Sequence, residues 1–93
     1  MSIIKVIIPP FNEAESIGLV VNDIPDSVSE VIVVSNGSTD KTEERAAAAG
    51  ATVLTEPRKG YGYACLRGIE YLLESGSAPD ILVFLDGDYS DYP

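Results

Sequence analysis

Ninety-three residues are enough for one small domain, and 45% hydrophobic with 8% aromatic residues indicates a folded chain rather than a disordered one. Fifteen acidic against six basic residues give a formal net charge of −9, which disfavours binding to nucleic acid or to anionic lipid. The absence of histidine excludes histidine metal ligands and Ser-His-Asp triads, and the single cysteine excludes an internal disulfide. Without an apolar run long enough to cross a bilayer or a secretory leader, we expect a cytoplasmic protein.

Four runs rich in valine and isoleucine predict β-strands, and such continuous apolar stretches are typical of parallel strands that are covered on both faces. The expected strands are residues 3–9, 30–35, 51–56 and 80–86.

Helical patterns separate these strands. The first lies within residues 12–25 and stops at a proline, and its expected buried face is Ile17, Val20, Val21 and Ile24. The second lies within residues 39–50, with acidic residues early and a glycine at its end. The third lies within residues 60–76, and the residues expected on its buried side are Cys65, Ile69, Leu72 and Leu73.

The alternation of strands and helices predicts an α/β fold, a Rossmann-like, doubly wound parallel sheet with alternating helices. In such sheets ligands bind at the carboxyl ends of the strands. Four unusual peptides follow the expected strand ends: PPFNE, SNGSTD, EPRKGYG and DGDYSDYP. Since all four fall on one edge of the expected sheet, we interpret that edge as the candidate site.

Three aspartates follow the last expected strand: Asp86, Asp88 and Asp91. The small Gly87 between the first two lets both carboxylates turn toward one point, and oxygen ligands of this kind suit Mg²⁺ or Mn²⁺. Aspartate and glycine are also common turn formers, but the place after a strand on the candidate edge favours the metal. Asp91 is either a third ligand, directly or through water, or the start of the next helix.

The loop after the second expected strand presents Ser35 and Asn36, followed by Ser38 and Thr39. Ser38 or Thr39 can cap the next helix, and the free N–H groups at that helix N-terminus also suit the polar groups of a nucleotide.

The other two loops complete the candidate site. After the first strand, Phe11 can stack on a base, and Glu13 either accepts from a base edge or caps the next helix. Arg58 and Lys59 are the basic residues of this edge, and they either meet a diphosphate or form a solvated turn. The loops together predict a site for a nucleoside diphosphate and a divalent metal, although neither a P-loop nor a G-x-G-x-x-G motif is present.

Four peptides resemble, in order and spacing, the N-terminal half of family 2 glycosyltransferases of the GT-A fold. They are VIIPPFNEAESI, VIVVSNGSTDKT, GATVLTEPRKGYGYA and ILVFLDGDYSDYP. The likeness covers nearly the whole chain and is closest to the branch with dolichyl- and polyprenyl-phosphate mannosyl- and glucosyltransferases. It implies an inverting transfer of a sugar from a UDP- or GDP-linked donor to an acceptor such as a polyprenyl or dolichyl phosphate.

The resemblance also implies roles for single residues. Asp86 and Asp88 would hold Mg²⁺ or Mn²⁺ against the diphosphate of the donor, where the ion stabilises the charge of the leaving group. Pro9, Phe11 and Glu13 match the segment that contacts the nucleoside.

The chain departs from the family pattern in two of its motifs, at three positions. Where the family usually has two aspartates, the first of which helps to hold the nucleoside, this chain has Ser35 and Asn36. Either side chain can form hydrogen bonds, but the charge-assisted bond of a carboxylate is lost. Phe11 replaces a tyrosine of the family, which keeps the ring and removes the hydroxyl. These departures bear on the identity of the donor more than on the fold.

The resembling enzymes continue beyond the position of Pro93, and that continuation supplies the acceptor site, the catalytic base and often a membrane-associating tail. We therefore interpret residues 1–93 as the nucleotide-sugar-binding part of a GT-A domain, truncated before its acceptor-binding part. Alone, this part is expected to bind a metal–nucleotide weakly and to show little or no transferase activity. An unprotected edge strand also favours pairing with a second copy of the chain, to give a homo-oligomer.

Two alternatives remain open from the residues alone. A sugar-phosphate nucleotidyltransferase also combines a metal with an α/β sheet, but it needs a glycine-rich, basic signature after the first strand, where this chain has PPFNE. A non-catalytic nucleotide-binding or assembly module is the other alternative.

Overall fold

A computed structural model describes residues 3–9, 14–36, 41–58, 60–76 and 79–85, in which four strands and three helices alternate. The strands are β1 (Ile4–Ile8), β2 (Glu30–Ser35), β3 (Thr52–Thr55) and β4 (Ile81–Phe84). The helices are α1 (Ala14–Asp23), α2 (Thr42–Ala48) and α3 (Tyr61–Ser75). Every predicted element is therefore present, and β2 has the predicted bounds.

The strands form one parallel sheet in the order β3-β2-β1-β4, which confirms the predicted fold class. The register places Ile7 of β1 opposite Ile32 of β2 on one side and opposite Phe84 of β4 on the other. The chain moves outward from β1 through β2 to β3, and then returns through α3 to place β4 on the far side of β1. The strand order therefore reverses between β1 and β4, which makes this the topological switch point of the sheet.

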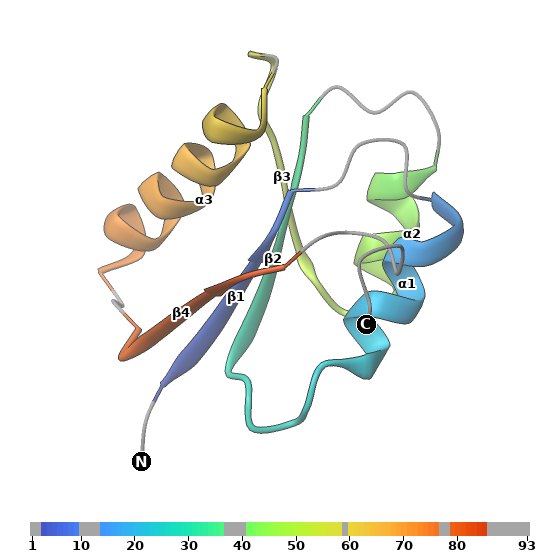
Figure 1. Ribbon diagram of the computed structural model, residues 1–93, viewed down its shortest axis with the longest axis horizontal. Coiled ribbons are helices and arrows are strands. Elements are labelled where there is room, and N and C mark those ends of the chain that lie inside the picture. The colour runs from blue at the N-terminus through green and yellow to red at the C-terminus, as the bar shows by residue number, and fades with distance from the viewer. Residues whose placement is uncertain (1–2, 10–13, 37–40, 59, 77–78, 86–93) are drawn as a thin grey trace.

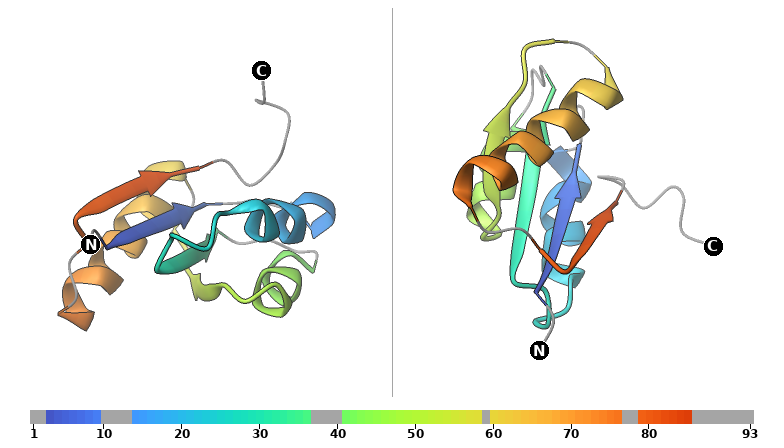
Figure 2. Two further views of the ribbon diagram at one scale, coloured as in Figure 1. Left: turned by 90° about the horizontal axis from the view of Figure 1, so that it is seen from below. Right: turned by 90° about the vertical axis from the view of Figure 1, so that its left-hand side faces the viewer.

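The helices cover the two faces of the sheet unequally. Figure 1 shows α1 and α2 on one face and α3 on the other, and both views of Figure 2 agree with this division. Side chains of successive strand residues point to opposite faces, so each central strand contributes to two cores. The core beneath α1 and α2 is formed by Val6, Ile8, Ile17, Val20, Val21, Val33 and Ala46. The core beneath α3 is formed by Ile7, Ile32, Val34, Ala64 and Leu72.

The expectation that all strands are covered on both faces is wrong for β4. Ile81 is 46% exposed and Phe84 is 41% exposed, whereas the apolar residues of β1 beyond Ile4 are buried. Phe84 pairs with Ile7 and faces α3, but α3 packs against β1, β2 and β3. Ile81 pairs with Ile4 on the opposite face, where α2 packs against β2 and β3, so neither face of β4 is well covered. β4 is an edge strand of the described sheet, and its pairing with a second copy stays a prediction.

The predicted inner side of α3 is also partly wrong. Leu73 is 72% exposed, and Cys65 is only half-buried. Ala64, Gly68 and Leu72 lie at four-residue spacing and face the sheet, so Leu73 is turned about 100° away from that line. The end of the helix is as predicted, because Gly76 adopts a left-handed conformation with φ 71°.

A polar cluster lies beneath α3 at the edge of the sheet where the strands begin. Lys5 Nζ lies 3.2 Å from Glu30 Oε1, and both residues face α3 from neighbouring strands. Glu30 Oε2 accepts hydrogen bonds from Thr52 Oγ1 at 2.9 Å and from the Tyr71 hydroxyl at 2.8 Å. One carboxylate thus connects three strands to the helix.

Within the described residues, no helix has the length and apolar character that crossing a membrane requires.

Candidate functional site

The carboxyl ends of all four strands lie on one edge of the sheet, because the strands are parallel. This is the edge that the loop sequences indicated. The Leu85 N–H donates to the Ile7 carbonyl at 3.1 Å, so the chain runs beside β1 up to the residue before Asp86. The first aspartate of the D-x-D pair therefore begins directly after the switch point between β1 and β4, where ligands bind in open α/β sheets.

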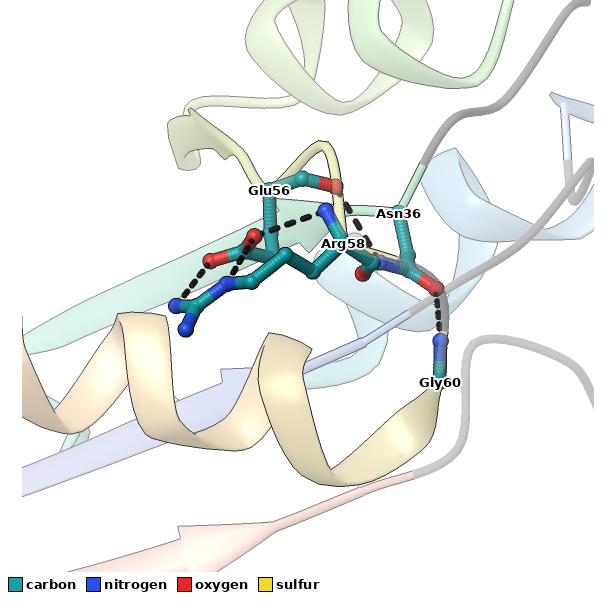
Figure 3. A network of polar contacts seen from close by, with 4 residues as sticks. All are labelled: Asn36, Glu56, Arg58 and Gly60. Carbon is teal, nitrogen blue, oxygen red and sulfur yellow. Dashed lines mark hydrogen bonds and ion pairs between the residues drawn. The ribbon is translucent and has the colours of Figure 1, made fainter.

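Asn36 joins the end of β2 to the segment that follows β3. Its Nδ2 donates to the Glu56 carbonyl at 3.1 Å and to the Arg58 carbonyl. Its Oδ1 accepts a hydrogen bond from the Gly60 N–H at 2.8 Å (Figure 3). Asn36, one of the predicted substrate-binding residues, thus has its side-chain amide engaged by the loop leading into α3.

Glu56 holds Arg58 by two contacts to its side chain and one to its backbone. The Arg58 Nε and Nη2 atoms donate to Glu56 Oε2 at 2.9 Å and to Oε1 at 3.0 Å, and the Arg58 N–H donates to Oε2 at 2.8 Å. The guanidinium carbon lies 4.5 Å from the centroid of the Tyr63 ring, a cation–π distance. The Arg58 side chain is 50% exposed, while that of Glu56 is 3% exposed. Arg58 therefore reaches solvent at the candidate edge with its charge balanced by a buried carboxylate.

The hydrogen bonds from the Arg58 side chain and backbone lower the pKa of Glu56 from 4.5 to about 2 against the opposing effect of burial. A carboxyl group with a lowered folded-state pKa stabilises the fold above its unfolded pKa, and this contribution is lost as the pH falls through the folded value. We expect Glu56→Gln to be less stable than the unmodified chain at pH 7, and the gap to close between about pH 4.5 and 2. Urea unfolding across this pH range measures the gap.

Glu44→Gln on the exposed surface of α2 is the matched control for this substitution. A gap between Glu56→Gln and the unmodified chain that stays constant down to pH 2 would contradict the proposed ion pair.

Ser35 lies at the end of β2 with no exposed surface, and its buried Oγ has no hydrogen-bond partner among the described residues. Buried hydroxyl groups in folded proteins usually have a partner, so an unpaired one at a candidate site needs an explanation.

A shallow depression of about 400 Å³ lies beside the first turn of α3 and is lined by Gly60, Gly62, Tyr63 and Leu66. Gly60 has φ 124°, a conformation that side chains rarely adopt, so a glycine is required where the loop enters the helix.

Four of the predicted site residues are described: Pro9, Ser35, Asn36 and Arg58. Pro9 follows β1 and is half-buried on the same edge. The other predicted residues lie outside the described residues, as do the predicted helix caps Ser38 and Thr39. These site residues are Phe11, Glu13, Lys59, Asp86, Asp88 and Asp91. Among the described residues, no three acidic or cysteine side chains gather closely enough to hold a metal ion.

Glu56 was not predicted as part of the site. The sequence holds one signal for it, an acidic residue at the end of a strand two positions before an arginine. In an extended chain residues i and i+2 share one face, so this spacing permits the contact, but the local pattern does not show that it forms.

Comparison with known families defines the class of the protein. The model of glycosyl transferase family 2 matches residues 5–93, and the chain belongs to this family. This family match favours a glycosyltransferase over the alternative of a sugar-phosphate nucleotidyltransferase.

The similar proteins are longer than this chain. Glucosyl-3-phosphoglycerate synthase of Mycolicibacterium smegmatis is 36% identical over 100 residues, which cover 95% of this chain and 31% of that protein. Protein RfbJ of Shigella flexneri is 39% identical over 87 residues, which cover 91% of this chain and 64% of RfbJ. The chain thus spans about a third of the synthase and less than two thirds of RfbJ.

A solved structure shares the fold described here. The crystal structure of glucosyl-3-phosphoglycerate synthase from Mycobacterium tuberculosis matches with a TM-score of 0.78 and 36% identity. The match covers 94% of this chain and 33% of the synthase. That crystal contains Mn²⁺, UDP-glucose and phosphoglyceric acid.

Proposed function

We propose that this chain binds the nucleoside diphosphate part of a sugar donor, as the donor-binding part of an inverting glycosyltransferase. The observation that carries the proposal is the position of the switch point. β1 and β4 are neighbours on opposite sides of the switch point, the D-x-D sequence follows Leu85 in the chain, and β2 and β3 end on the same edge of the sheet. Residues 1–93 then form one nucleotide-sugar-binding unit of the GT-A fold.

We propose UDP as the nucleotide and Mn²⁺ or Mg²⁺ as the ion. The similar synthase is crystallised with Mn²⁺ and UDP-glucose and also with Mg²⁺ and UDP. The residues of this chain fit such an ion, because Asp86 and Asp88 offer carboxylate oxygens directly after the switch point, with Asp91 as the candidate third ligand. When bound, the ion supplies positive charge that stabilises the leaving diphosphate.

The described residues support separate roles for the loops after β2 and β3. The buried hydroxyl of Ser35 has no partner in the part of the chain that the structure describes, which suits a hydrogen bond to the nucleoside. Arg58 keeps guanidinium N–H groups that Glu56 does not use, and these can donate to the diphosphate. Because Glu56 balances its charge, Arg58 contributes directed hydrogen bonds more than net positive charge.

The remaining roles are proposed from the family pattern alone. Pro9, Phe11 and Glu13 are assigned to the nucleoside side and Lys59 to the diphosphate. The catalytic base is not assigned to any residue of this chain.

For the acceptor we propose a phosphorylated molecule. The family resemblance points to a polyprenyl or dolichyl phosphate, and the similar synthase is crystallised with phosphoglyceric acid. Both candidates carry a phosphate, and they differ in the apolar chain. A lipid acceptor would bring the protein to a membrane surface.

Calorimetric titration of UDP with and without Mn²⁺ tests the donor site. We expect weak binding that requires Mn²⁺, and Asp88→Ala is expected to weaken it at least about tenfold, which corresponds to about 1.4 kcal/mol. GDP in a parallel titration tests the choice of base.

Asp26→Ala is the control for this titration, because Asp26 is exposed in the connection between α1 and β2. UDP binding of equal strength without the metal, or in the Asp88→Ala chain, would argue against the proposed metal site.

A further inference from the structure

We propose that Asn36 is a positioning residue, whose amide sets the backbone of Glu56, Arg58 and Gly60 so that Arg58 can meet the diphosphate of the donor. The inference rests on the proposed function and goes beyond it in naming a residue that acts through another. It also assigns a purpose to one of the departures from the family pattern.

The chemistry of the three contacts requires an amide at this position. Carbonyl oxygens only accept hydrogen bonds, so the Glu56 and Arg58 carbonyls must face the Nδ2 group of Asn36. The Gly60 N–H only donates, so it must face Oδ1. An aspartate of the same shape would keep the bond from Gly60, but it has no hydrogen for the two carbonyls. Its negative charge would also repel both oxygens.

The Arg58 backbone is held from two sides. Asn36 binds its carbonyl, and Glu56 binds its N–H at 2.8 Å. The start of the segment is fixed to β2, because the Glu56 N–H donates to the Ser35 carbonyl at 2.9 Å. These contacts determine where the Arg58 side chain leaves the backbone, and the Tyr63 ring then supports the guanidinium.

Asn36 acts indirectly in this arrangement. Its amide atoms face the loop (Figure 3), so its effect on a ligand passes through the position of Arg58. Removing its two donor bonds should therefore loosen Arg58 while leaving every guanidinium atom in the protein.

Asn36→Asp tests the proposal with little change in shape. Hydrogen exchange of the Arg58 N–H is the structural measurement, because this group bonds to Glu56 and responds to residue 36 only if the segment moves. We expect its protection to fall at least about tenfold and the dissociation constant for UDP with Mn²⁺ to rise about tenfold, as expected for the loss of two hydrogen bonds. Asn36→Ala, which lacks the repulsive charge, is expected to change both in the same direction.

Asn22→Asp is the matched control, because Asn22 is exposed near the end of α1, and it should leave both quantities unchanged. If Asn36→Asp keeps the protection of the Arg58 N–H, the inference is wrong. If protection falls but UDP affinity does not, Asn36 has only a structural role, and the inference is again wrong. If the unmodified chain does not bind UDP with Mn²⁺, the proposed function itself fails, and the ligand role of Asn36 fails with it.

Discussion

Gly68→Val is expected to destabilise the fold by about 2–3 kcal/mol through overpacking. A Cβ atom built at Gly68 would lie 2.8 Å from Ile7 Cδ1 and 3.0 Å from Ile7 Cγ2. Ile7 is fully buried in the central strand, so it has little room to move away. Valine would add two further carbons to this contact and push α3 off the sheet. Urea unfolding measures the loss.

Gly62→Val in the same helix is the control, because a Cβ atom at Gly62 meets nothing within 4 Å. A double-mutant cycle with Ile7→Ala gives a sharper test. Ile7→Ala alone costs about 2–5 kcal/mol through its cavity, but it removes the atoms with which the introduced valine side chain would collide. The double variant should therefore be more stable than the sum of the single effects predicts. Strict additivity would show that the two sites are not in contact.

Glu30→Gln is expected to lower the free energy of unfolding by about 2–3 kcal/mol. This loss is close to the lower limit for breaking a buried ion pair, because Glu30 is partly exposed. The substitution removes the negative charge 3.2 Å from the nearly buried Lys5 Nζ. It also replaces the carboxylate that accepts hydrogen bonds from the hydroxyl groups of Thr52 and Tyr71 by a neutral amide. Chemical unfolding at pH 7 measures the effect.

The pH dependence gives a second measurement on Glu30. Burial raises its pKa, but hydrogen bonds from Tyr71, Thr52 and Lys5, together with the charge of Lys5, outweigh burial and lower the pKa below 4.5. The stabilisation by Glu30 is therefore complete above the unfolded pKa and is lost as the pH falls through the folded value.

Tyr71→Phe, which removes one hydrogen bond to Glu30 and keeps the ion pair with Lys5, should lower the free energy of unfolding by about 1 kcal/mol. A larger loss in Tyr71→Phe than in Glu30→Gln would contradict this account.

The strands and helices could be predicted because each depends on a local pattern. Runs such as VIVV admit few conformations other than a buried strand, and Pro25 and Gly76 end helices through their own backbone preferences. The shared edge of the four loops then followed from the parallel alternation of strands and helices.

The errors arose where burial depends on neighbours distant in sequence. Leu73 and Phe84 are apolar and were placed correctly in a helix and a strand region, but the position of α3 leaves both exposed. Periodicity identifies an apolar face without revealing how much of it another element will cover.

The polar contacts of the site were beyond sequence reasoning for a similar reason. Asn36 bonds to groups 20 to 24 residues away, and its partners are backbone atoms, which every residue possesses. Lys5 stands within an apolar strand, and only the register of β1 against β2 identifies Glu30 as its partner.

Helix α3 connects the two polar clusters of the molecule. Its first turn follows the Asn36 contacts, and Tyr71 near its other end binds Glu30 at the opposite edge of the sheet. The fifteen residues of α3 measure about 22 Å, and polar contacts hold the helix at both ends. Between these ends, Gly68 packs against Ile7 of β1. The two polar clusters at opposite edges of the sheet are therefore joined by a single helix, and neither end can shift without straining the contacts of the other.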